Sequence, residues 1–167
     1  MMIQKLKALR VRILVFLTHA AALPFLKMII KPNPFPCSLT KLTEMPKGIV
    51  GRDLADFMVA KNINLLPGYE RHDMKHFLLG FDTTEEGEIC MQCFMLGNGR
   101  ISFPVLITVI FGIIFTPEYH LKMKQSYGNG KNATIIHDWD WFALLPQETN
   151  YVRNKIFKTE QSNQILL

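Results

Sequence analysis

Two histidines and two carboxylates of the kinds that bind divalent metal ions lie within one short stretch of this chain. They are His72, Asp73, His76 and Glu88, and they follow the pattern H-D-x-x-H-x11-E. Two histidines with one carboxylate and open positions are typical of non-haem iron(II) sites, and zinc accepts the same nitrogen and oxygen ligands. A second carboxylate favours a harder ion with more ligands. The pattern therefore predicts a divalent metal site, with zinc, iron and magnesium as candidates.

The first three of these side chains are expected on one helix. Residues 68–79 contain no proline, and their apolar positions suit a helix. At about 100° per residue, His72, Asp73 and His76 occupy little more than one quadrant of its surface. Gly80 is expected to end this helix, because glycine commonly follows a helix C-terminus.

A second helix is expected to bring the fourth side chain to the same place. Thr83, with Glu86 three residues later, is a capping-box signal for the start of that helix, so residues 81–83 indicate a tight turn. His76 and Glu88 each lie a little over one helical turn from the bend, so they can meet at one height across a hairpin. The motif thus predicts a central metal-binding helical hairpin.

Two enzyme classes with related motifs fit less well. Zinc peptidases use H-E-x-x-H, in which the glutamate acts as a base beside the metal; Asp73 is one carbon shorter, and the extra carboxylate here comes from another helix. His-Asp phosphohydrolases are a nearer rival, but they need further histidines and an aspartate from other helices. His120, His137 and Asp138 are available for that purpose, although no spacing in the sequence supports it.

A purely structural interpretation also exists for the motif. His72 and Asp73 would then form a surface ion pair, and His76 would be a core histidine. Glu88, placed across the predicted hairpin, favours a metal site over this interpretation.

Length and composition predict one globular domain. The chain has 167 residues, nearly half of them apolar and a fifth charged, which is enough for a hydrophobic core. Residues 1–160 are expected to form the domain and residues 161–167 a flexible tail. Helical periodicity recurs and no β-type alternation persists, so we expect an all-α, single-domain bundle of about six to eight helices. Helices are expected at residues 3–23, 38–43, 50–60, 68–79, from 83, 103–115, from 117 and 147–157.

The net charge of +5 is unevenly distributed. Seven basic residues precede Glu44, the first acidic one, and a basic, apolar amino end is attracted to anionic membrane surfaces. This end also resembles a transit peptide, although it has few serines. A nucleic-acid partner is not expected, because aromatic and basic residues are not interleaved along any groove.

Two apolar stretches resemble membrane or signal-peptide segments, and one cysteine pair resembles a redox or metal motif. Residues 13–25 have the character of a signal-peptide core, and residues 101–115 fall short of the roughly 20 needed to span a bilayer; both are expected to be buried helices. Cys90 and Cys93 form a C-x-x-C, but on a helix they lie opposite Glu88. We therefore expect two buried thiols, and no redox or metal site, at this pair.

The motif and its surroundings resemble a known family. The H-D-x-x-H-x11-E pattern resembles the signature of the ubiquinone (coenzyme Q) biosynthesis family called Coq-four. Residues 45–52 resemble the M-P-x-G-x-x-G-R stretch of that family, and the pair at residues 152–153 resembles a V-R near its carboxyl end. Gly80 and the Gly87-Glu88 pair fit the same signature. The resemblance is good over about residues 45–100 and loose over 135–157.

The resemblance implies a function as well as a fold. It implies an all-α protein with a divalent metal at His72, Asp73, His76 and Glu88, and a hydrophobic place for a prenylated quinone precursor or another isoprenoid lipid. The expected activity is oxidative decarboxylation, in which the ring carboxylate is replaced by hydroxyl. The alternative is a non-catalytic lipid-binding scaffold for other quinone-biosynthesis proteins. No residue is assigned a catalytic role.

The resemblance also implies a location. We expect a peripheral protein on a membrane: in the cytoplasm on the inner membrane if the source is bacterial, or on the matrix side of the mitochondrial inner membrane if it is eukaryotic. A homodimer is one arrangement compatible with this expectation.

Overall fold

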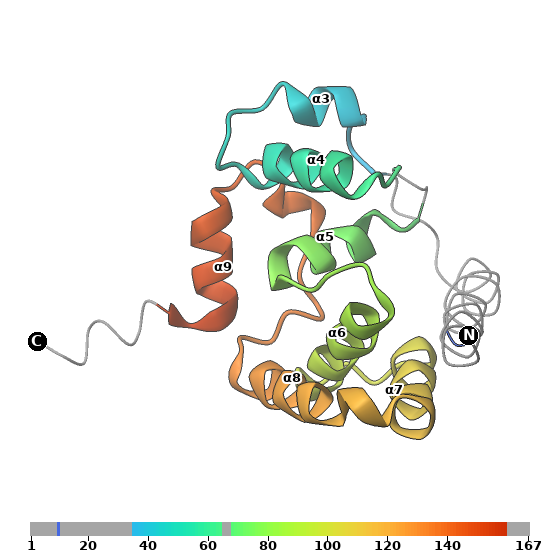
Figure 1. The fold of residues 1–167 in the computed structure, drawn as a ribbon. Helices are drawn as coiled ribbons and strands as arrows, with labels where there is room; N and C mark the ends of the chain where they lie inside the picture. Colours follow the sequence, from blue (N-terminus) through green and yellow to red (C-terminus); the bar gives the residue numbers. More distant parts are fainter. Residues whose placement is uncertain (1–9, 11–34, 65–67, 160–167) are drawn as a thin grey trace, which may run out of the picture. The chain divides into compact units, whose positions relative to one another are not determined.

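The computed structural model describes residue 10, residues 35–64 and residues 68–159. These residues form seven α-helices and two short 3₁₀ helices (Figure 1). They contain no strand, and their β-type pairing is a single bridge between Ile49 and Glu148. The all-α prediction is confirmed. The predicted helix at 3–23 and the predicted tail at 161–167 lie outside the described residues, except for Arg10.

The described residues belong to two compact units. One unit takes its described residues from Arg10 and 84–131, and the other from 35–64, 68–83 and 132–159. The single domain over residues 1–160 stays a prediction. The first unit holds α6 (Glu85–Gly97), α7 (Phe103–Phe115), η2 (Pro117–Tyr119) and α8 (His120–Asn132). The second holds α3 (Leu39–Thr43), α4 (Val50–Lys61), α5 (Glu70–Leu79), η3 (Phe142–Leu144) and α9 (Thr149–Phe157).

Local signals set the ends of the second unit's first helices, as expected. The Ser38 hydroxyl oxygen accepts a hydrogen bond from the Lys41 backbone N–H at 3.3 Å and caps α3. Leu54 and Met58, one turn apart on α4, are fully buried. Asn62 ends α4 in the left-handed conformation, with φ of 54°, which asparagine tolerates better than most residues.

The M-P-x-G-x-x-G-R stretch acts as a joint between the start of α4 and the start of α9. Gly48 has a φ of +85°, and Gly51 packs so close that an added Cβ would lie 3.2 Å from the Leu145 carbonyl oxygen. Asp53 bridges the two helices: Oδ1 accepts from the Gly48 N–H at 2.9 Å, and Oδ2 accepts from the Thr149 hydroxyl at 2.6 Å. This part of the family resemblance therefore has a structural explanation.

Helix α5 is held from two sides within the same unit. The Phe57 ring of α4 lies 5.8 Å from the Phe77 ring of α5, between centroids. From α9, Arg153 donates through Nη2 to the Phe77 carbonyl oxygen at 2.8 Å and stacks over the Phe77 ring at 5.0 Å. Val152 beside it is buried. Of the V-R pair, Val152 thus belongs to the core, and Arg153 fixes α5 through its two contacts with Phe77.

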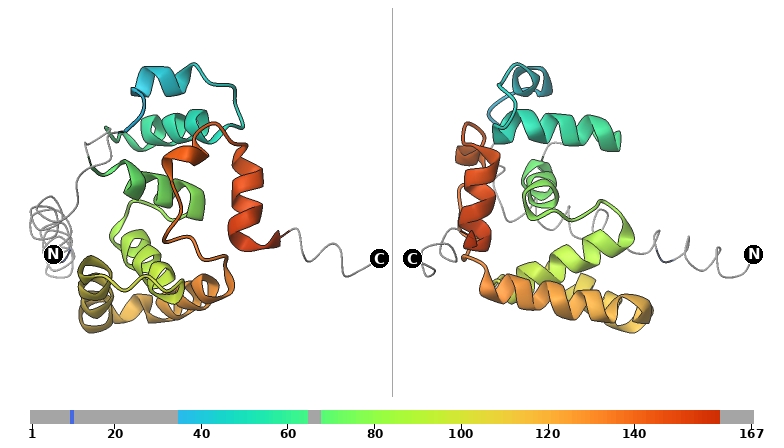
Figure 2. Two further views of the ribbon diagram at one scale, coloured as in Figure 1. Left: turned by 180° about the vertical axis from the view of Figure 1, so that it is seen from behind. Right: turned by 60° about the vertical axis from the view of Figure 1, so that its left-hand side comes forward.

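In the first unit, α6 and α8 approach each other through glycines (Figure 2). A Cβ at Gly97 would collide with the Tyr127 carbonyl oxygen, and one at Gly130 with the Phe94 carbonyl oxygen. Residues 128–132, which the sequence suggests are a flexible loop, are instead the last turns of α8. The close approach explains the difference, because it needs glycine inside a helix and tertiary packing offsets the low helix propensity.

Helix α7 has the predicted bounds but not the predicted burial. One side packs in a cluster with α6 and α8, made of Ile89, Cys93, Val109, Phe111 and Met123. The opposite side is exposed, so the expectation of a buried helix is wrong for that side. No single helix among the described residues is long and apolar enough to cross a membrane; α7 with the segment 117–132 passes such a test only as a pair bent by 104°.

Candidate metal centre

Helix α5 brings the two motif histidines together. Because they are four residues apart, their side chains lie on one face of the helix. The Nε2 atoms of His72 and His76 are 3.1 Å apart, and the rings meet edge to face with centroids 4.7 Å apart. His72 is half-buried, whereas His76 is only 3% exposed. The interpretation of His76 as a buried residue and its interpretation as a ligand are therefore compatible.

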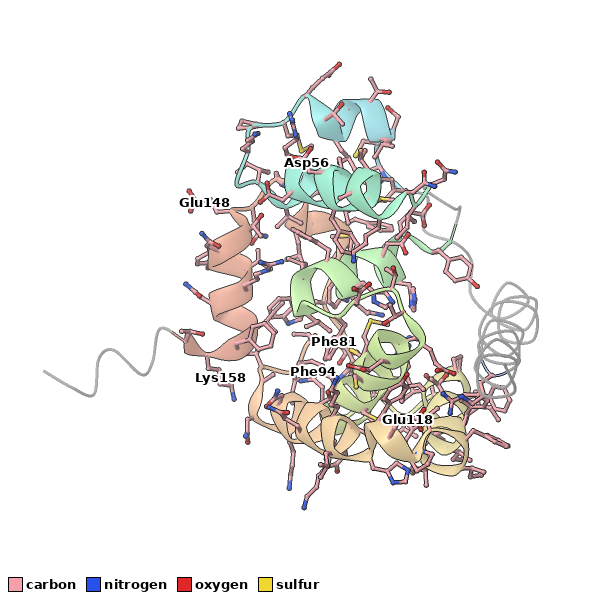
Figure 3. The ribbon with its side chains drawn as sticks, viewed as in Figure 1. Asp56, Phe81, Phe94, Glu118, Glu148 and Lys158 are labelled. Carbon is pink, nitrogen blue, oxygen red and sulfur yellow. The ribbon has the colours of Figure 1, made fainter. Side chains whose placement is uncertain are left out.

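The bend after α5 orients His76. Gly80 ends the helix with a φ of +76°, as the sequence predicts, and the chain then turns back. Phe81, in this bend (Figure 3), donates its N–H to the His76 carbonyl oxygen at 3.0 Å. The Phe81 carbonyl oxygen in turn lies 3.3 Å from His76 Nδ1. A carbonyl can only accept, so Nδ1 donates to Phe81, and Nε2 is the ring nitrogen that faces His72.

This arrangement fits a divalent ion. Histidines that bind metals usually donate their other ring N–H to a carbonyl or carboxylate, as His76 does to Phe81. Two Nε2 atoms 3.1 Å apart that both lie about 2.1 Å from an ion subtend an angle of roughly 95° at that ion. Neighbouring ligands of an octahedral ion subtend 90°, so the His72–His76 pair suits such geometry with little adjustment.

Asp73 is buried on the same helix, with 8% of its surface exposed. Burial of a carboxylate is costly unless hydrogen bonds or opposite charges compensate it, and Asp73 does have such an interaction in the structure. Its assignment as a metal ligand stays a prediction.

The start of α6 differs from expectation by one residue. Thr84, not Thr83, is the cap: its hydroxyl oxygen accepts from the Gly87 N–H at 3.2 Å. Thr83 donates its own N–H to Asp82 Oδ1 at 2.6 Å, which keeps it in the bend. Glu86, the expected capping-box partner, forms an ion pair with a lysine of α8 instead. The predicted cap at Thr83 was wrong because the aspartate before it competes for that backbone N–H.

Glu88 lies on the first turn of α6 and is oriented by Gln92. The Gln92 side-chain amide donates to Glu88 Oε1 at 2.8 Å, and Gln92 itself is buried. Hydrogen bonds of this kind orient ligating carboxylates. The sequence places Gln92 on the Glu88 side of the helix without assigning it a role. His72 and His76 belong to one unit and Glu88 to the other, and their joint binding of a metal ion stays a prediction.

The other candidate residues have local roles. His120 Nε2 lies 2.9 Å from the Ile113 carbonyl oxygen, at the end of α7. His137 and Asp138 pair with each other, with Nε2 and Oδ2 3.1 Å apart. None of these contacts supports the phosphohydrolase interpretation. Cys90 and Cys93 are free and buried, as expected, and burial raises the pKa of the Cys93 thiol to about 12.

The described residues form an all-α fold that carries a histidine pair suited to a divalent metal. A crystal structure of a protein from Nostoc punctiforme PCC 73102, described as a "putative ubiquinone biosynthesis protein", is similar in fold, with a TM-score of 0.57. The two sequences are 23% identical, over 91% of this chain and 81% of that chain. No protein-family profile matches the chain, and neither does any curated protein. At this identity the likeness shows a shared fold alone.

Proposed function

We propose that this chain is a metal-binding protein of ubiquinone or related prenylated-quinone biosynthesis. The observation that carries the proposal is the His72–His76 pair, whose Nε2 atoms lie 3.1 Å apart while the Phe81 carbonyl orients the second ring. Asp73 and Glu88 complete the proposed ligand set. The similar Nostoc protein adds support, because its description places it in ubiquinone biosynthesis.

Chain length supports the inclusion of Glu88. Only residues 80–84 separate α5 from α6, and five residues span at most about 18 Å when fully extended. The Asx-type bond at Asp82 and the left-handed Gly80 shorten this connection. Glu88, on the first turn of α6, is therefore the carboxylate that this short connection makes available as a further ligand, and Gln92 orients it.

The proposed reaction is oxidative decarboxylation of a prenylated aromatic precursor. The ring carboxylate would leave as carbon dioxide and a hydroxyl would take its place, with molecular oxygen as the two-electron oxidant and the source of that hydroxyl oxygen. A bound divalent ion with open positions supplies a Lewis acid for the ring carboxylate and the neighbouring phenol oxygen. The protein's part is orientation: α5 holds the two imidazoles with their Nε2 atoms 3.1 Å apart, and the Phe81 carbonyl fixes the second ring. The Phe- and Met-rich helices are suited to an isoprenoid tail.

Metal analysis tests the ligand assignment. Purified wild type, reconstituted with zinc, iron(II) or magnesium and then desalted, is expected to retain about one ion per chain. The double variant His76→Ala, Glu88→Ala is expected to retain little, and His120→Ala, which alters an exposed histidine of α8, is the matched control. Equally low metal retention by the wild type and the double variant would show that these residues do not form a metal site.

The second candidate is a lipid-binding scaffold without chemistry of its own. The exposed apolar side of α7 favours it, because such a surface serves binding and not catalysis. Folded motif variants that lose product formation favour the enzyme. Folded variants that lose metal but still sustain quinone synthesis in a complemented strain favour the scaffold. Either protein would lie peripherally on the bacterial inner membrane or on the matrix side of the mitochondrial inner membrane.

A further inference from the structure

One side of α7 is apolar and exposed along its whole length. We define the α7 apolar face as the five side chains that are exposed there. These side chains are Phe103, Leu106, Ile110, Ile113 and Ile114. Ile110, Ile113 and Ile114 are 50%, 55% and 61% exposed. Such a contiguous patch marks an interaction site and is not the scattered exposure seen on ordinary surfaces.

Helical geometry explains why one helix has both a core side and this face. At about 100° per residue, the five side chains fall within an arc of about 100°. The buried residues Val105, Val109 and Phe111 lie on the other side, and Val109 and Phe111 pack with α6 and α8. Every residue of α7 is uncharged. The helix is therefore anchored in its own unit on one side and presents only hydrocarbon on the other.

Exposed apolar side chains also occur just before the helix and on the helix that follows it. Ile101 before it is 77% exposed, and Leu121 on the following α8 is 84% exposed. A helix of 13 residues is about 20 Å long, too short to cross a bilayer but suited to lie in its interface.

The charges of the segment that follows α7 favour an anionic partner. From residue 116 to residue 132 the chain carries three lysines and one glutamate. Glu118 is neutralised by Arg10, whose Nη2 lies 2.6 Å from its Oε1. Lys122 pairs with Glu86, which leaves Lys124 and Lys131, both exposed, as the unscreened positive charges of α8.

We propose that the α7 apolar face lies on an anionic lipid surface, with Ile110, Ile113 and Ile114 in the hydrocarbon boundary and lysines of α8 near the headgroups. A second copy of the chain is less suitable, because a two-fold interface would bring identical lysines of both copies to its rim. Anionic headgroups complement them instead. The proposal does not depend on metal binding at the motif.

Vesicle flotation of the full chain tests the proposal. Wild type is expected to float with vesicles of phosphatidylcholine and phosphatidylglycerol, and less with phosphatidylcholine alone. Ile110→Glu, Ile114→Glu places two charges in the proposed boundary, and its partition coefficient is expected to fall about tenfold or more. The matched control is Val59→Glu, which adds a charge at an apolar position of α4 that is 66% exposed; it should float like wild type.

A second variant keeps the test independent of the fold of α7. Lys124→Glu, Lys131→Glu changes only exposed positions, so it should fold normally and lose the preference for anionic vesicles. Thermal unfolding and light scattering are measured on every variant.

Three results would each overturn the proposal. If the isoleucine variant floats like wild type, another surface binds lipid. If wild type does not float and is a dimer that the isoleucine variant dissociates, the partner is a second copy. If wild type is a monomer that does not float, and the isoleucine variant unfolds at a lower temperature, the chain itself covers this face.

Discussion

The ring nitrogen Nδ1 of His76 lies 3.3 Å from the carbonyl oxygen of Phe81, five residues further along the chain. Phe81 also donates its own N–H to the His76 carbonyl oxygen at 3.0 Å. Two hydrogen bonds therefore join these residues, one between their backbones and one from the His76 ring to the Phe81 backbone. The bend after α5 is thus part of the candidate site, because it sets which imidazole nitrogen is available to a metal.

Gly80 is expected to matter for metal binding through this bend. Gly80→Ala forces a side chain into a φ of +76°, which should lower the free energy of unfolding by about 1 kcal/mol and displace the Phe81 carbonyl. We expect metal affinity to fall roughly 10- to 100-fold, as for other losses of such a hydrogen bond. Competition with a chromogenic chelator measures it.

Gly68→Ala is the matched control for that prediction. Gly68 has a φ of +91° and open space around it, as Gly80 does, but it precedes α5. The two variants should lose similar stability, and only Gly80→Ala should lose affinity. Equal affinities for the two variants would mean that the bend does not orient His76.

The pKa of Asp82 is expected to depend on Lys61. The Lys61 ammonium donates to Asp82 Oδ2 at 2.9 Å, and this hydrogen bond, with a bond from the Thr83 backbone, holds the pKa of that carboxyl below its usual value. A lowered folded-state pKa stabilises the fold above the unfolded pKa of about 3.9, and this stabilisation is lost as pH falls below it. An NMR titration of the Asp82 carboxyl should show a higher midpoint in Lys61→Ala. Arg52→Ala, which breaks the Arg52–Asp56 pair of α4, should leave that midpoint unchanged.

Cys93 is expected to be inert at neutral pH. Burial raises its pKa to about 12, so the thiolate that reacts with disulfide reagents is scarce. The half-buried Cys37 should react first in the native protein, and all three thiols should react in denaturant. Rapid labelling of Cys93 in the native protein, mapped by peptide mass spectrometry, would contradict its burial in the α6–α7 cluster.

The same thiol makes stability fall at alkaline pH. Its pKa is 9.0 in its ordinary state and about 12 in the fold. Above the ordinary value the unfolded chain loses this proton while the native chain keeps it, so the free energy of unfolding decreases between these two pH values. Urea unfolding should show a weaker alkaline decrease for Cys93→Ala than for Cys37→Ala. If the free energy of unfolding has the same pH dependence in both variants, the Cys93 thiol does not contribute to the alkaline decrease.

Two glycines of α8, two residues apart, should respond oppositely to alanine. Gly130→Ala places a Cβ against the Phe94 carbonyl oxygen and is expected to lower the free energy of unfolding by about 1–3 kcal/mol. Gly128 has open space, so Gly128→Ala should raise it by about 0.5–1 kcal/mol through helix propensity. Urea unfolding measures both values. If both variants lower the free energy of unfolding, the effect of Gly130→Ala does not come specifically from the contact with α6.

Local interactions made much of this protein predictable from its sequence. The bounds of α7, the cap at Ser38 and the stop at Gly80 each follow from a few neighbouring residues and the backbone conformations that they allow. The pairing of His72 with His76 follows from helical spacing alone. The cap of α6 was misplaced by one residue, because Thr83 and Thr84 are both favourable N-cap residues and Asp82 accepts from the Thr83 N–H.

Tertiary structure decided what the local pattern could not express. Helix α7 is apolar on every side, so its periodicity could not reveal which side is buried; only packing against α6 and α8 leaves Ile110 and Ile114 exposed. The helical state of Gly130 depends on the backbone of α6. The orientation of His76 depends on a carbonyl oxygen, which every residue possesses and no sequence pattern marks. The motif determined which ligands are present, and the fold of the bend decided which atom of His76 can bind.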